Sequence, residues 1–282
     1  MKAIVLNLSA WMILPFMDAI AKYLSTELPF FQITWARYFF TVFWTLPFMF
    51  FFFRNDLKFS ENPKLQILRG LTLLSANICF FYSISIISMA KALTLAFVAP
   101  LVTTALSPII LKEKVGIRRW TAVIIGFLGS LVVIRPGFIE FNLATVAAIG
   151  TGCFYGFYLI ITRKLHSTDN PLLTLLFTGV VGAFVSTIFV PIVWISPTIT
   201  QWFWLGLMGI FACLGHILLI YSLKYADASK LAPFGYFEII TNVILGYYIF
   251  KDFPDIWNLV GLSIIVFSGY YVYNREKYLN TI

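Results

Sequence analysis

Apolar stretches of about 20 residues follow one another along nearly the whole chain, and short connections between them hold most of the charges. A helix needs about 20 mostly apolar residues to cross the hydrocarbon core of a bilayer. With 60% hydrophobic and only 11% charged residues, the chain has too little charge to solvate the surface of a soluble protein. We therefore predict an all-α integral membrane protein with ten transmembrane helices in the lipid bilayer, at residues 3–24, 33–53, 67–87, 92–111, 119–134, 143–163, 173–194, 202–223, 231–250 and 256–273.

The basic residues predict how these spans are oriented. With ten spans both termini share one side, and fifteen of the 20 Lys and Arg residues then fall on that side, against three on the other. Cytoplasmic loops carry an excess of Lys and Arg, so both termini are predicted to be cytoplasmic in a multi-pass protein of the cell inner membrane. The net charge of +8 is spread over short clusters, which argues against a nucleic-acid partner.

The chain also contains a weak internal repeat. A displacement of 139 residues brings Tyr82 onto Tyr221, together with several flanking residues. This predicts two five-helix repeats, residues 1–137 and 138–282. Because five is odd, the second repeat enters the membrane in the reverse direction, and inverted repeats around a central site are typical of transporters.

Ionisable residues within predicted spans, apart from the arginines counted with the loops, are Asp18, Lys22, Arg37, His216 and Glu238. A charge at the centre of a membrane helix costs about 2.5–3.5 kcal/mol, so these side chains are expected to face protein or water. Asp18 and Lys22, four residues apart, could merely neutralise each other, and Arg37 could extend to the lipid boundary. Glu238 lies near mid-membrane and is expected to recognise an amine or to exchange a coupled proton. His216 could share that proton, bind substrate or bond a local carbonyl.

Two lysines and two prolines extend the candidate site. Lys91 and Lys230 begin the fourth and ninth spans at positions related by the repeat. They could contact the substrate, or they could simply anchor the helix ends at the membrane surface. Pro100 and Pro108 interrupt backbone hydrogen bonding in the fourth span, which predicts a kink that could serve in gating. Aromatic side chains deep within spans could stack on a flat substrate, namely Trp11, Trp44, Tyr82, Tyr221 and Tyr236.

Motifs of catalysis and of cofactor binding are absent from the sequence. It holds no glycine-rich phosphate loop, no HExxH and no Cys/His cluster, and Cys79, Cys153 and Cys213 each lie inside an apolar run. We therefore expect no cofactor, no metal and no enzymatic activity. A channel is disfavoured because the polar positions are scattered. A receptor or a lipid-modifying enzyme is disfavoured because the connections between the spans are short. A homodimer is left open.

Several short motifs resemble those of a known family. They are Asp18-Ala-Ile-Ala-Lys22, Trp35-Ala36-Arg37, Ala99-Pro100, Arg135-Pro136-Gly137, Tyr225-Ala226-Asp227-Ala228-Ser229 and Ala232-Pro233. In these the chain resembles, over essentially its whole length, the ten-span EamA-type branch of the drug/metabolite transporter superfamily. It departs from that pattern in having Lys112-Glu113 and Lys251-Asp252 where family members usually have Gly-Glu. The resemblance implies transport of small organic metabolites, including amino acids, S-adenosylmethionine and riboflavin, inward or outward.

Together these features predict a secondary active transporter for a small polar metabolite, working by alternating access. We expect a central cavity lined mainly by spans one to four and six to nine. Glu238 would be the coupling or amine-recognising group, and Asp18, Lys22 and Arg37 would be charge contacts suited to a zwitterion. A facilitative exchanger or exporter is the alternative, and proton coupling is left open.

Overall fold

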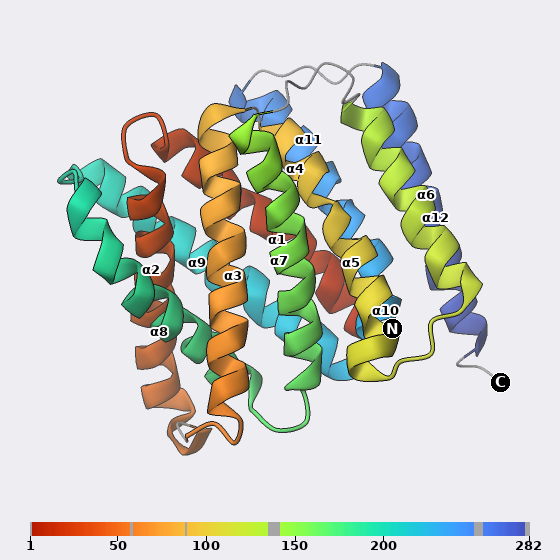
Figure 1. Ribbon diagram of the computed structural model, residues 1–282, viewed down its shortest axis with the longest axis horizontal. Helices are drawn as coiled ribbons and strands as arrows, with labels where there is room; N and C mark the ends of the chain where they lie inside the picture. Colours follow the sequence, from red (N-terminus) through yellow and green to blue (C-terminus); the bar gives the residue numbers. More distant parts are fainter. Residues whose placement is uncertain (1, 57–58, 88, 135–141, 251–255, 280–282) are drawn as a thin grey trace.

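The computed structural model describes residues 2–56, 59–87, 89–134, 142–250 and 256–279, and every regular element within them is helical (Figure 1). Each of the ten predicted apolar stretches coincides, within a few residues, with one helix or with a series of consecutive helices. The elements are α1 (Lys2–Leu24), α2 (Phe30–Phe52), η1 (Arg54–Asp56), α3 (Pro63–Ile86), α4 (Met89–Ala96), α5 (Val98–Leu106), η2 (Ser107–Leu111), α6 (Ile117–Ile134), α7 (Leu143–Lys164), α8 (Pro171–Phe189), η4 (Val190–Val193), α9 (Ile199–Tyr225), α10 (Ala228–Leu231), η5 (Ala232–Phe237), α11 (Glu238–Phe250) and α12 (Ile256–Leu279).

Six helical segments of the described chain are long and apolar enough to cross a membrane. The ten-span count itself stays a prediction. The six segments are Lys2–Leu24, Pro63–Ile86, Ala92–Leu111, Leu143–Lys164, Pro171–Val193 and Ile199–Tyr225.

The centre of the fold consists of two long helix pairs, α1 with α9 and α3 with α7 (Figure 1). Between α1 and α9, the ring of Phe16 stacks on that of Phe211 at 5.2 Å, and Gly215 leaves room for the side chain of Leu14. Each pair takes one helix from the first part of the chain and one from the second. The two parts are therefore intertwined rather than side by side.

A fully buried arginine joins α3 to α7 and α8. Arg69 donates hydrogen bonds to the hydroxyls of Thr162 (2.7 Å), Tyr158 (2.8 Å) and Thr178, and to the carbonyl of Thr174 (3.1 Å). Arg69 is one of the fifteen basic residues that we counted on the side of the termini. Its guanidinium is satisfied by threonine and tyrosine oxygens inside the bundle.

Contacts between helix ends give the relative directions of α1, α3, α7 and α9. The ammonium of Lys2 lies 4.6 Å from the ring centre of Tyr225, and a guanidinium nitrogen of Arg163 lies 3.0 Å from a carboxylate oxygen of Asp227. The start of α1 therefore lies at the same end of the bundle as the ends of α7 and α9, called the N-terminal end below. At the opposite end, Lys22 of α1 contacts the last turn of α3.

The predicted boundary between the two repeats, between residues 137 and 138, lies outside the described residues.

Two helices are broken where they meet the centre of the bundle. Phe97 separates α4 from α5, and a 3-10 turn, η5, separates α10 from α11. Pro100 has no N–H to offer the carbonyl of Ala96, four residues earlier, and Gly152 of α7 leaves that carbonyl the space a side chain would fill. Discontinuous helices at mid-membrane are tolerated where they line a cavity.

Candidate functional site

A central cavity of about 80 Å³ lies where these broken helices meet the two long pairs. That space is enough for several water molecules. Residues of α1, α3, α4, α5, α7, α9, α10, η5 and α11 line it, whereas α2 and α8 contribute none. We expected both of these helices in the lining, but they pack against each other and against the outside of α9 and α3. The polar lining residues are Asn7, Asp18, Asn77, Thr103, Thr151, Tyr155, His216 and Glu238.

Two carboxyl groups, one from each part of the chain, make the cavity acidic. Asp18 lies on α1 and Glu238 opens α11, and they are only 5% and 8% exposed. Neither carboxyl group has a hydrogen bond or an ion pair within the described chain, and both line the cavity. No Lys or Arg is among the described lining residues. The described chain also gathers no group of three metal-ligating side chains. Two carboxyl groups at one cavity can accept hydrogen bonds from an ammonium group or exchange a proton.

A chain of hydrogen bonds runs behind the cavity from one buried arginine to another. A guanidinium nitrogen of Arg37 lies 2.5 Å from Nε2 of His216, whose Nδ1 lies 3.0 Å from the hydroxyl of Tyr158. Because a guanidinium only donates, Nε2 accepts, and His216 is a neutral ring that donates through Nδ1. The Tyr158 hydroxyl also accepts from Arg69. Arg37 is 2% exposed, so it does not extend to the lipid boundary.

Asp18 and Lys22 do not pair, although their spacing allows it. The Lys22 ammonium donates instead to the carbonyl of Ile84 and, at 3.3 Å, to that of Ile87. Lys22 therefore does not occupy the Asp18 carboxyl group, which lines the cavity. Asp18 and Lys22 therefore do not neutralise each other on α1.

Trp11 is the one predicted aromatic residue among the described lining residues, and its ring is fixed in place. Its indole N–H donates to the side-chain oxygen of Asn7 at 2.9 Å, and the Asn7 amide donates to the hydroxyl of Ser222 at 3.1 Å. The Trp11 ring centre lies 5.8 Å from that of Tyr155, which also lines the cavity. These two rings form a wall on which a flat group could stack.

The other predicted aromatic residues lie outside the lining. Trp44 is exposed on α2, where its indole donates to the carbonyl of Gly206 at 3.1 Å. Tyr82 on α3 and Tyr221 on α9 are half-buried, and Tyr236 is fully buried in η5.

The predicted prolines and lysines occupy different places. Pro100 lines the cavity, whereas Pro108 is exposed in the π-helical turn η2. Lys230 lies half-buried on α10. Lys91 lies on α4, and its side chain is outside the described part of the protein.

Several neutral polar residues of the site were missed because we searched the spans for ionisable groups. Asn7, Asn77 and Tyr155 line the cavity, and Tyr158 bonds His216 directly behind it. The signal was present for Asn7 and Asn77, since an amide within an apolar span needs partners. Asn77 finds them in the Tyr38 hydroxyl and the Leu73 carbonyl, both at 2.7 Å.

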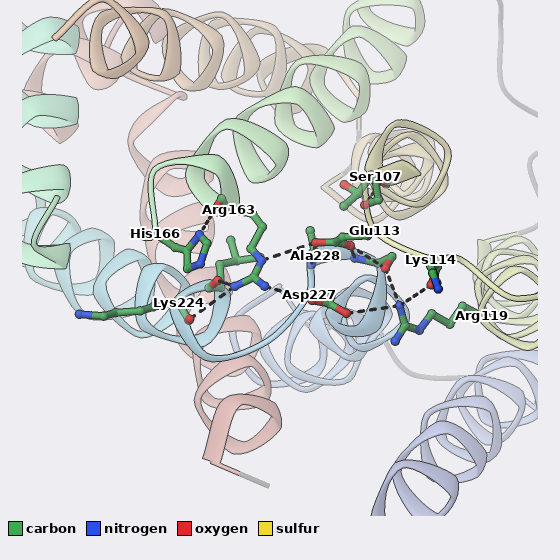
Figure 2. Close-up of polar contacts among 12 residues, drawn as sticks. Ser107, Glu113, Lys114, Arg119, Arg163, His166, Lys224, Asp227 and Ala228 are labelled. Carbon is green, nitrogen blue, oxygen red and sulfur yellow. Dashed lines mark hydrogen bonds and ion pairs between the residues drawn. The ribbon is translucent and has the colours of Figure 1, made fainter. Parts of the chain in front are cut away.

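The N-terminal end of the cavity is bordered by an ionic cluster, shown in Figure 2. The Glu113 carboxylate accepts from the backbone N–H groups of Ala228 and Ser229, both at 3.0 Å, and from the Ser229 hydroxyl at 2.7 Å. Arg163 lies between Glu113, at 3.5 Å, and Asp227, at 3.0 Å (Figure 2). Glu113 belongs to the segment in which the sequence departs from the usual Gly-Glu.

Comparison with known proteins agrees with this architecture. A family model described as EamA-like transporter family matches twice, at residues 1–135 and 142–274. An S-adenosylmethionine uptake transporter of Rickettsia bellii is 30% identical over 260 residues, which is 92% of this chain and 89% of that protein. A riboflavin transporter of Vibrio cholerae is 29% identical over 66% of this chain and 63% of its own length.

A solved crystal structure shares the fold. It superposes with a TM-score of 0.77 over 95% of this chain and 94% of that chain, at 17% sequence identity. The two family matches cover both parts of the sequence, and the apolar helices are those of a multi-pass membrane protein. This chain belongs to the EamA-like transporter family.

Proposed function

We propose that the protein is a secondary active transporter of a small organic cation that also carries a flat ring. The observation that carries this proposal is the acidic cavity: Asp18 and Glu238 face it without a protein partner in the described chain. Burying a carboxylate is unfavourable unless it is paired, so a cationic substrate would supply the missing partner. The wall formed by Trp11 and Tyr155 would receive the ring.

S-adenosylmethionine fits this description better than riboflavin. It carries a sulfonium and an ammonium group together with a planar adenine, whereas riboflavin has a large flat ring and no cation. The relatives named as S-adenosylmethionine uptake transporters also match this chain over more of its length than the riboflavin transporter does. We therefore take S-adenosylmethionine as the first substrate to be tested.

The transport mechanism in this proposal is alternating access across the cell inner membrane. Ten spans in two inverted five-helix repeats would place both termini in the cytoplasm, as the distribution of basic residues predicts. The opposite directions of α1 and α7 support the inversion. A coupled proton would bind at Glu238 or Asp18, the carboxyl groups open to the cavity.

Uptake into liposomes tests the substrate. Protein reconstituted with labelled S-adenosylmethionine should accumulate it saturably and show counterflow, which a pore does not. Asp18→Asn or Glu238→Gln should each weaken apparent affinity about tenfold or more, because a hydrogen bond to a charged group is worth about 1.5–3 kcal/mol. Glu61→Gln, an exposed carboxylate away from the cavity, is the matched control. Equal uptake by all three variants would refute the cation site.

Uptake at imposed pH gradients tests coupling. An inward proton gradient should accelerate uptake by the unmodified protein and lose that effect in Glu238→Gln. If Glu238→Gln responds to the gradient as the unmodified protein does, then Glu238 does not carry the coupled proton.

A further inference from the structure

The two helix pairs around the cavity are internally well packed, and direct contacts between the two pairs are few. Across the cavity, the described contacts at mid-height include the hydrogen bond of His216 to Tyr158, at 3.0 Å, and the ring contact of Trp11 with Tyr155, at 5.8 Å. His216 and Trp11 belong to the α1/α9 pair, and the two tyrosines belong to the α3/α7 pair. The cavity therefore separates two bodies that each mix both parts of the sequence.

A cation joins these two bodies at the end opposite the N-terminus. Lys22, in the last turn of α1, donates to the carbonyl of Ile84 and, at 3.3 Å, to that of Ile87 at the end of α3. The carbonyls at a helix C-terminus lack partners in the helix and carry partial negative charge, so a cation is favourable there.

A second cation joins the bodies at the N-terminal end, in the same way. Arg163, in the last turn of α7, donates to the carbonyl of Leu223 at 2.8 Å and to that of Lys224 at 3.4 Å, both at the end of α9. Arg163 also reaches Asp227 at 3.0 Å, and Glu113 binds the start of α10 beside it (Figure 2).

The acceptor ends of the two contacts are related by the internal repeat, and the two cations lie 141 residues apart, within two residues of it. Leu223 follows Ile84 by 139 residues, the displacement that superimposes the two parts of the sequence. In each part, a cation in the last turn of the first helix binds the carbonyl end of the third helix. Because α1 and α7 run in opposite directions, the two contacts lie at opposite ends of the cavity.

We infer that Lys22 and Arg163 are opposed gate latches: each holds the α1/α9 pair against the α3/α7 pair at one end, and each must release before the cavity opens there. The inference rests on the alternating access proposed above and adds the residues that would control it. The helix ends cannot separate while a charged side chain bridges them. Breaking one latch favours opening of the cavity at that end. The two helix pairs would turn about their contacts at mid-height, so opening at one end brings the helices closer at the other and disfavours opening there.

Accessibility of single cysteines tests the latches without any substrate. In protein with its three native cysteines replaced, Leu223→Cys places a probe at the N-terminal end of the cavity, and Leu93→Cys places one at the opposite end. Both are labelled in detergent with a charged thiosulfonate. Arg163→Met should raise the labelling rate of the first probe about tenfold and lower that of the second, and Lys22→Met should do the reverse.

The controls distinguish a latch from a general loss of structure. Lys164→Met removes the same charge one residue later, at an exposed side chain, and should change neither rate. Arg163→Lys and Glu113→Gln weaken the Arg163 latch without removing a side chain from it. Both should change the labelling rates of the two probes in the same directions as Arg163→Met, but by less. Rates that rise together at both ends, or that stay unchanged, would overturn the latches. Uptake is not measured, so failure of the substrate proposal would leave this result intact.

Discussion

Arg37 and Arg69 are two buried arginines whose replacement by Met should have very different consequences for stability. They are 2% and 0% exposed, and a guanidinium offers five N–H donors. Arg69 uses them on four bonds to oxygen acceptors of three threonines and a tyrosine. Arg37 has one bond to the His216 ring and one to the weakly accepting sulfur of Met17, at 3.1 Å. The hydrogen bonding of Arg69 is nearly complete, and that of Arg37 is not.

The magnitudes follow from these bonds. At about 1.5–3 kcal/mol for each bond from a charged group, Arg69→Met loses about 6–12 kcal/mol, and Arg37→Met loses about 2–4 kcal/mol. Each substitution also removes the several kcal/mol that burial of the charge costs. The free energy of unfolding should therefore fall by about 3–5 kcal/mol for Arg69→Met and change little for Arg37→Met.

Thermal unfolding in detergent, followed by tryptophan fluorescence, measures the difference. At about 2 °C per kcal/mol for a chain of this size, Arg69→Met should lower Tm by about 6–10 °C, and Arg37→Met by less than about 2 °C. Equal losses of Tm in the two variants would show that the hydrogen bonds do not govern the burial of these charges.

Three further substitutions test packing, the aromatic wall and a loop contact. Gly182→Val forces a side chain into the ring of Tyr38, which should cost about 1–3 kcal/mol of stability and lower Tm. In Gly206→Ala the added methyl group meets its nearest neighbour, Phe40, at 3.6 Å, so Tm should not change. Asn7→Leu removes the anchor of the Trp11 indole and should weaken substrate affinity about threefold to tenfold, with unaltered affinity counting against the wall. Asp169→Asn loses charge-assisted bonds from Ser60 (2.6 Å) and Gln66 (2.7 Å) and should speed proteolysis at residues 53–62; an unchanged cleavage rate would contradict this.

The positions of the helices could be predicted because apolar run length and the loop charges both reflect the bilayer. The runs at 3–24 and 143–163 correspond closely to α1 and α7. The breaks were partly visible: Pro100 indicated the one in the fourth apolar stretch, but the 3-10 turn of η5 was not expected, although Pro233 lies within it.

The site was predictable only where a single residue carried the signal. Glu238, Asp18 and His216 were found because an ionisable group in an apolar run is costly wherever it lies. The role of Arg69 could not be predicted, because its threonine partners lie about 90 to 110 residues further along the chain. In the sequence these threonines look like ordinary residues of apolar helices. Local spacing also suggested a pair between Asp18 and Lys22, but the lysine binds the carbonyls at the end of α3 instead.

The intertwining of the two parts of the chain has a consequence for biogenesis. Asn7 bonds Ser222, which is synthesised 215 residues later. At about 5–20 residues per second, the first helix waits roughly ten to forty seconds in the lipid or beside the insertion machinery before its partner emerges. During that interval its amide and the carboxyl group of Asp18 lack the neighbours they have in the finished bundle. An early chain released at this stage would be a substrate for membrane quality control, and neither part of the sequence is expected to fold alone.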